Sequence, residues 1–211
     1  RFLTEVVSAR GQTQVRTSTG LVLDGIKPAS MGFDVVLAPG ILADDAAGLC
    51  ARAGEFDLEA EYLRRLHAAG VRVAGSCSGT LLLAKSGLLD GRRATTSWWL
   101  GATFRKAFPR VQLDTDQMIV DDGGVITTGA ATAVLNLVMR LVAEVAGNDL
   151  AQQVGHMLAF DAERQSQAPY ISMALLERPR TSLAEKAEKY LRTAIDSEIS
   201  VTALAQHCGT S

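Results

Sequence analysis

The sequence has few cysteines, few histidines and no long apolar run. Its three cysteines, Cys50, Cys77 and Cys208, form an odd, widely spaced set in 211 residues. Such a set is typical neither of a disulfide framework nor of metal-ligand spacing. We therefore expect no metal, no cofactor and a location in the reducing cytoplasm.

The charge balance is also nearly neutral, with a formal net charge of -2. This excludes a general basic bias toward nucleic acid or an anionic membrane surface. No apolar run approaches the ~20 residues that a membrane-spanning helix needs. Hydrophobic residues make up 47% and charged residues 21%, as in a packed globular protein. The chain opens on Arg1 without an initiator methionine, so we expect it to be a fragment.

Short apolar runs alternate with amphipathic stretches, which is typical of an α/β fold with parallel strands. One predicted helix, 57–69, carries its apolar stripe on Leu58, Tyr62, Leu63 and Leu66, and another, 130–145, is apolar nearly all round and should be buried. A turn at 121–124 should join the last two strands. Strands are expected at 3–8, 20–23, 34–38, 71–75, 93–96, 111–113, 118–120 and 125–128, and the other helices at 78–86, 98–108 and 149–160, followed by a loop at 161–170.

The last segment differs in character. Ser182 and Glu185 form a capping box for a helix whose apolar stripe is Leu183, Ala187, Tyr190, Leu191 and Ile195. Ser200 then caps a short helix, 201–207, which Gly209 ends. We place a domain boundary near 176–181, which gives a domain at 1–176 and a helical segment at 177–211.

The most informative motif is Gly75-Ser76-Cys77-Ser78-Gly79, between the strand 71–75 and the helix 78–86. Small residues around a central cysteine, at a strand-to-helix turn, are typical of a nucleophile elbow. The amides at the start of the following helix favour a thiolate. The amides of Ser78 and of the Gly40-Ile41 turn are candidate donors to an oxyanion.

A proton-shuttling base is harder to find. The chain has only His67, His156 and His207, and none follows a strand end where it could face Cys77. Each is interpreted as a surface or packing histidine. Two interpretations of Cys77 stay open: a reactive thiol, or an inert elbow that is kept for its shape. Cys50 and Cys208 belong to no motif and should be packing residues.

A family resemblance rests on the elbow together with Gly87-Leu88-Leu89-Asp90-Gly91-Arg92-Arg93-Ala94-Thr95-Thr96. These residues resemble the class I glutamine amidotransferase-like domain of the PfpI superfamily, in the form fused to AraC-type DNA-binding domains, the GlxA-like regulators. Phe108-Pro109, Asp121-Asp122-Gly123, Thr127-Thr128-Gly129-Ala130 and the loop 165–170 follow the same order, and 200–211 is similar to the start of an AraC helix-turn-helix. The resemblance implies a flavodoxin-like parallel sheet sandwiched by helices, a homodimer, and DNA binding through the complete C-terminal domain.

The chain departs from the family pattern at two places. The slot after Thr95-Thr96 that normally holds the partner histidine is Ser97, and the usual Pro-Gly-Gly turn is Pro39-Gly40-Ile41. Serine is no base near neutral pH, so the usual dyad is broken. The family's first strand and helix, and a recognition helix after Ser211, are also absent from this sequence.

We therefore expect a pseudoenzyme that senses a small molecule within an AraC-type transcription regulator. The elbow would bind the effector, for example a nitrogenous metabolite, which Trp98 or Trp99 could cage if it is cationic. The pocket candidates are Gly40, Ile41, Cys77, Ser78, Ser97 and Trp98. Two alternatives remain: an active cysteine-dependent hydrolase or hydratase of the PfpI superfamily, and a dimerisation module without a ligand. We expect no membrane partner.

Overall fold

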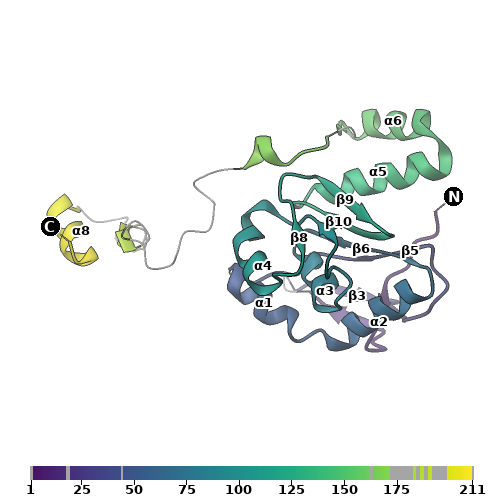
Figure 1. The fold of residues 1–211 in the computed structure, drawn as a ribbon, viewed down its shortest axis with the longest axis horizontal. Coiled ribbons are helices and arrows are strands. Elements are labelled where there is room, and N and C mark those ends of the chain that lie inside the picture. Colours follow the sequence, from purple (N-terminus) through teal and green to yellow (C-terminus); the bar gives the residue numbers. More distant parts are fainter. Residues whose placement is uncertain are drawn as a thin grey trace. The chain divides into compact units, whose positions relative to one another are not determined.

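The structure is a computed structural model and describes residues 2–17, 20–43, 45–161, 164–171, 183, 186–187, 190–191 and 199–210 (Figure 1). The chain divides into two compact units, Arg1–Ser172 and Met173–Ser211. The predicted boundary at 176/177 falls among residues outside the described ranges and stays a prediction. In the described part of the chain, no helix has both the length and the apolar character that crossing a bilayer requires.

The first unit is built around a four-stranded sheet in the order β5-β6-β10-β9. The strands are β5 (Val35–Ala38), β6 (Arg72–Ser76), β10 (Val125–Thr128) and β9 (Ile119–Asp122). The first three are parallel, with Val36 opposite Val73 and Ala74 opposite Ile126. β9 is antiparallel to β10, so the predicted turn at 121–124 joins them. This arrangement confirms the predicted α/β fold.

Helices cover both faces of this sheet (Figure 1). On one face lie α1 (Ala46–Ala53), α2 (Asp57–Ala68), α3 (Thr80–Lys85) and α4 (Gly101–Ala107). On the other face lies α5 (Ala133–Ala146), and α6 (Asn148–Met157) packs on the far side of α5. Neighbouring residues of β6 serve different faces: Val73 belongs to the larger core cluster with α1–α4, and Ala74 to a smaller one with Leu137 of α5. The alternation follows from the period of two along a strand.

Two predicted helical faces are corrected. On α2 the buried positions are Ala60, Leu63 and Leu66, whereas Leu58 is exposed. The buried positions follow one another at intervals of three, and residues three positions apart are neighbours on the helix surface. Helix α5 is not buried all round, since Val138 and Val145 are exposed. It lies on the outer side of a single sheet, which covers one face of a helix only.

Three short pairs of strands complete the first unit. β1 (Val7–Ser8) pairs in parallel with β4 (Lys27–Pro28), β2 (Gln14–Arg16) is antiparallel to β3 (Val22–Asp24), and β7 (Arg93–Ala94) is parallel to β8 (Gln112–Leu113). The predicted strand 3–8 is thus much shorter. Helix α1 and strands β2 and β4 were not predicted. Three single turns of 3₁₀ helix are η1 (Cys77–Gly79), η2 (Trp98–Leu100) and η3 (Ala168–Tyr170).

The second unit contains α8 (Val201–Cys208). The hydroxyl of Ser200 accepts a hydrogen bond from the amide of Ala203 at 3.1 Å, and Gly209 ends the helix with a φ of 74°. Both predicted caps are therefore confirmed. The ring of His207 stacks on Tyr190 with centroids 4.3 Å apart, which makes it a packing histidine. Ser182, Glu185 and Ile195 of the preceding predicted helix lie outside the described residues.

Candidate functional site

The predicted turn between strand and helix is present at Cys77. Strand β6 ends at Ser76, η1 begins at Cys77 and α3 follows at Thr80. Cys77 has a φ of 56°, a left-handed conformation that it shares with only one other non-glycine residue of the described ranges, Ala159. Such a backbone costs on the order of 1–3 kcal/mol, and it is held in place by its surroundings.

The flanking glycines allow the backbone to pack this tightly. A Cβ added to Gly79 would lie 2.5 Å from the carbonyl oxygen of Ala38 and closer still to that of Pro39. A Cβ added to Gly75 would lie 3.0 Å from Thr80 Cα. The turn therefore presses against the carboxyl end of β5, where the Gly40-Ile41 turn begins.

Ser78 ties the elbow to that turn. Its Oγ accepts a hydrogen bond from the amide of Ile41 at 2.9 Å and donates one to the carbonyl of Ile41 at 2.6 Å. Gly40 lies beside both elbow residues, since an added Cβ there would be 3.4 Å from Ser78 Oγ and 3.6 Å from Cys77 Cβ. The amide of Ile41, considered above as an oxyanion donor, is therefore already engaged.

The sulfur of Cys77 faces a hydroxyl. Its Sγ lies 2.9 Å from the Oγ of Ser97, which is fully buried. Among the described residues of the first unit this is the hydrogen-bonding partner of the thiol, and neither His67 nor His156 bonds to it. Ser97 thus occupies the position beside the sulfur, although a serine hydroxyl cannot take up the thiol proton near neutral pH.

The three histidines lie elsewhere. His67 is near the end of α2, just before the amino end of β6, whereas Cys77 follows its carboxyl end. Burial, together with the positive charge of Arg92, lowers the pKa of His67 from its ordinary value. His156 is exposed on α6, and His207 belongs to the second unit. The positions of His67 and His156 agree with the interpretation of these two as surface or packing residues.

The two tryptophans differ in their surroundings. Trp99 is partly buried and packs against the larger core cluster. Trp98 is also partly buried, but it is not among the residues packed against that cluster. Since Trp98 follows Ser97 directly, it is the better candidate for contact with a ligand.

Sequence reasoning missed a layer of buried polar groups behind the elbow. The carbonyl of Cys77 accepts hydrogen bonds from the hydroxyls of Thr80 at 2.8 Å and of Thr96 at 3.0 Å. Gln167, which is 2% exposed, donates to the carbonyl of Thr96 at 3.0 Å. The adjacent Thr95-Thr96 pair was a signal of a polar site, but nothing in the sequence links it to a glutamine 71 residues later.

The described residues gather no group of three or more metal-ligating side chains. At the carboxyl end of β6 the structure thus brings together the Cys77 thiol and the buried Ser97 hydroxyl, and the half-buried Trp98 is the next residue in the chain. Ligands bind at this end of open α/β sheets. Among the described residues, the hydrogen-bonding contact of the thiol is with a hydroxyl and not with a base.

Residues 3–144, two thirds of the chain, match the DJ-1/PfpI family. The chain belongs to this family. Solved DJ-1/PfpI-type structures are similar to it: Drosophila melanogaster DJ-1beta superposes with a TM-score of 0.57 at 25% identity, over 72% of this chain and 80% of that one. A THiJ/PfpI family protein from Pseudomonas syringae gives a TM-score of 0.62 at 21% identity, over 97% and 78%.

Curated relatives of the chain include both a transcription regulator and an enzyme. The HTH-type transcriptional regulator GlxA of Rhizobium meliloti is 34% identical over 152 residues, which are 71% of this chain and 46% of the regulator. The isonitrile hydratase of Pseudomonas putida is 31% identical over 147 residues, 69% of this chain and 61% of the enzyme. The chain thus spans less than half the length of the regulator that it matches.

Proposed function

We propose that this chain is the effector-sensing part of an AraC-type transcription regulator, and that its elbow binds a small molecule without turning it over. The observation that carries the proposal is the 2.9 Å contact between the sulfur of Cys77 and the hydroxyl of Ser97. A thiol without a base can recognise a ligand but has no group to shuttle a proton through a catalytic cycle.

The likeness to named regulators supports the same proposal. Besides GlxA, the HTH-type transcriptional regulator CdhR of Pseudomonas aeruginosa is 36% identical over 107 residues, about half of this chain and a third of that protein. In the proposed regulator, the complete C-terminal domain binds DNA, the protein is a cytoplasmic homodimer, and the 177–211 segment is the start of the helix-turn-helix.

The proposed pocket comprises Gly40, Ile41, Cys77, Ser78, Ser97 and Trp98. Its groups favour a small ligand with polar atoms for the thiol and hydroxyl and a cationic or flat group for the indole of Trp98. Small nitrogenous metabolites have this chemistry.

Titration calorimetry with a panel of small amines, betaines and amino acids tests the sensor. At least one compound should bind, and Cys77→Ala and Trp98→Ala should each weaken its binding roughly tenfold or more. Cys50→Ala removes a thiol on α1 that is not part of the proposed pocket; it is the matched control and should bind normally. The sensor proposal fails if no compound binds and Cys77→Ala leaves the response of a reporter for the complete regulator unchanged.

An active hydratase or hydrolase is the second candidate, because of the likeness to isonitrile hydratase. It needs a base supplied from outside the described contacts of Cys77. Incubation of the protein with an isonitrile and chromatography for the corresponding formamide would detect it. Turnover that is lost in Cys77→Ala would favour the enzyme over the sensor.

A further inference from the structure

One buried side chain of the loop 164–171, that of Gln167, binds the Thr95-Thr96 pair, which in turn supports the Cys77 elbow. Its Nε2 lies within 3.3 Å of four acceptors, and its Oε1 accepts a hydrogen bond from the amide of Ala130 at 2.7 Å. The four acceptors are Thr95 Oγ1 at 3.3 Å and the carbonyls of Thr96 at 3.0 Å, Thr115 at 2.9 Å and Gln117 at 3.0 Å. A side-chain amide provides two N–H donors and one acceptor, so this site suits glutamine and no acidic or apolar residue.

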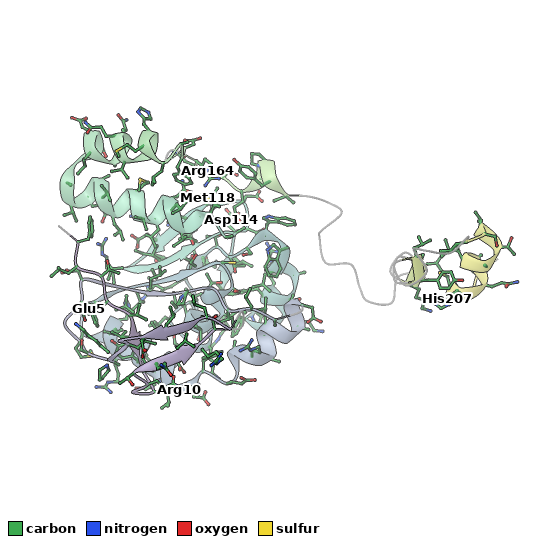
Figure 2. The ribbon with its side chains drawn as sticks, turned by 180° about the vertical axis from the view of Figure 1, so that it is seen from behind. Glu5, Arg10, Asp114, Met118, Arg164 and His207 are labelled. Carbon is green, nitrogen blue, oxygen red and sulfur yellow. The ribbon has the colours of Figure 1, made fainter. Side chains whose placement is uncertain are left out.

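The backbone of the loop is bound along the segment before β9. The amide of Gln167 donates to the carbonyl of Asp116 at 2.7 Å, and the amide of Met118 donates to the carbonyl of Gln165 at 2.9 Å. Figure 2 labels Arg164, the first residue of the loop, and Met118, whose amide makes the second of these bonds. The guanidinium of Arg164 donates to Asn136 at 3.1 Å, which fixes the start of the loop on α5. The loop is therefore a structured part of the first unit.

The same threonines that Gln167 holds also support the elbow. Thr96 Oγ1 donates to the carbonyl of Cys77 and lies 2.6 Å from the hydroxyl of Thr80. Ser97, the partner of the Cys77 sulfur, is the next residue after Thr96. The residue that bonds to the Cys77 sulfur is therefore the direct neighbour of the residue whose carbonyl accepts from Gln167.

Gly129 shows how closely the glutamine is enclosed. A Cβ added at this position would lie nearer to three atoms of the Gln167 amide than real Cβ atoms approach any neighbour. Gly129 does not have a positive φ, so its own backbone permits alanine. Gly129→Ala is thus a way to expel the Gln167 side chain without changing it.

We propose that Gln167 is a positioning residue that couples the occupancy of the Cys77–Ser97 site to the seating of the loop 164–171. The chain continues from this loop directly into the second unit, Met173–Ser211. The coupling rests on the proposed sensor function, to which it adds the route by which binding reaches the rest of the chain. The physical basis is that the site and the loop contact the same element, the Thr95-Thr96-Ser97 turn: Cys77 bonds to Ser97, and Gln167 bonds to Thr95 and Thr96. Two sites are coupled when both bias the state of one shared element.

Iodoacetamide is a probe that occupies the site without knowledge of the effector. The sulfur of Cys77 displaces iodide and forms an S–C bond, and the thiol proton passes to the buffer. With Cys50 and Cys208 replaced by serine, Cys77 alone is modified. Hydrogen exchange followed by mass spectrometry then compares the modified and unmodified 211-residue chain. After modification, the backbone amides of 165–171 should exchange at least about threefold faster, a change of the size that typical coupling free energies produce. The exchange rates of the amides of α2 should stay the same.

Two variants test the role of Gln167 itself. Gln167→Glu keeps the shape but turns a donor into an acceptor facing four oxygens, and Gly129→Ala expels the amide. Each should change the rate of Cys77 alkylation by at least about threefold, and in the same direction. A merely structural role would lower stability and leave this rate alone.

If neither Gln167→Glu nor Gly129→Ala folds, the exchange measurement on the chain that keeps Gln167 and Gly129 decides the proposal. Exchange of 165–171 that is unchanged by modification of Cys77 overturns the coupling, as do alkylation rates within twofold of the parent in both folded variants. Because the probe is not the effector, these results leave the calorimetric test of the sensor untouched. A negative calorimetric screen, in turn, leaves the coupling measurement standing.

Discussion

The hydroxyl of Ser78 closes a two-way hydrogen-bonded pair with the backbone of Ile41, since it accepts from the amide and donates to the carbonyl of the same residue. This pair joins the elbow to the turn that follows β5. It also means that the Ile41 amide is not a free donor for an oxyanion, because this amide already donates to Ser78 Oγ.

Ser78→Ala should therefore destabilise the protein. It leaves the amide and the carbonyl of Ile41 without their partner, and each part-buried unpaired group costs about 1–3 kcal/mol. Urea unfolding should show a loss of about 2 kcal/mol in the free energy of unfolding. Ser30→Ala, at an exposed serine, is the control and should change it by less than about 0.5 kcal/mol. Equal effects of the two substitutions would contradict the structural role of the pair.

Gly79→Ala should be one of the most damaging single-methyl additions in the chain. The added Cβ meets the carbonyl oxygens of Ala38 and Pro39, which are backbone atoms and cannot rotate away. We expect a loss of about 3 kcal/mol or more, toward the upper end for overpacking. Gly40→Ala is the matched control, because its nearest neighbour is Ser78 Oγ at an ordinary 3.4 Å. Urea unfolding compares the two variants. Equal midpoint urea concentrations for Gly79→Ala and Gly40→Ala would contradict the predicted clash.

Much of the fold could be predicted from the local spacing of apolar residues, because this spacing reflects which side chains are buried. The apolar runs of β5, β6 and β10 and the small residues around Cys77 lie where periodicity indicated. Helix α1 was missed, since Ala46–Ala53 is rich in alanine and glycine and offers only a weak apolar stripe. The contacts of Gln167 were also out of reach, because they join residues about 40 to 70 positions apart, and no local pattern specifies them.

The candidate site was only partly predictable for the same reason. Ser97 could be assigned to the histidine slot by the order of residues, and it does lie beside the sulfur of Cys77. The engagement of Ile41 with Ser78 could not be predicted, because a serine next to a cysteine gives no sign of which backbone group it will bind.

Stability should fall as the pH drops below about 6.5, and His67 should contribute to this loss. Burial, and to a smaller extent Arg92, lower its pKa in the folded protein below the ordinary value of 6.5. Between the two values the unfolded chain binds more protons than the folded one, so the free energy of unfolding decreases with decreasing pH. Below the lowered folded-state pKa the loss levels off.

Urea unfolding at pH 7.5 and pH 5.5 measures this contribution. His67→Gln should reduce the difference between the two pH values, whereas His156→Gln, at an exposed histidine of α6, should leave it in place. An unchanged difference in His67→Gln would show that other groups account for the acid sensitivity.

The 211-residue chain should not bind duplex DNA in a salt-sensitive way. Residues 177–211 carry five basic side chains, Arg178, Arg180, Lys186, Lys189 and Arg192, against five acidic ones, Glu177, Glu185, Glu188, Asp196 and Glu198. Without an excess of positive charge, few counterions are released from DNA. Fluorescence anisotropy with a labelled duplex should show weak binding with little change between about 50 and 200 mM salt. Tight, sequence-specific binding by this chain would refute the prediction.

Replacing Ser97 by histidine should make Cys77 more reactive. The side chain would stand beside the sulfur, where an imidazole stabilises the thiolate, the form that attacks iodoacetamide. In a background without Cys50 and Cys208, we expect the alkylation rate at pH 7 to rise roughly tenfold or more. Ser97→Asn, which has a similar polar bulk but no basic nitrogen, is the matched control and should not show the increase. Because Ser97 is fully buried, both variants should lose about 1–3 kcal/mol of stability, so circular dichroism must first show that they are folded. Equal alkylation rates in the two folded variants would mean that residue 97 does not control the thiol, and that the missing histidine is not what separates this elbow from an active one.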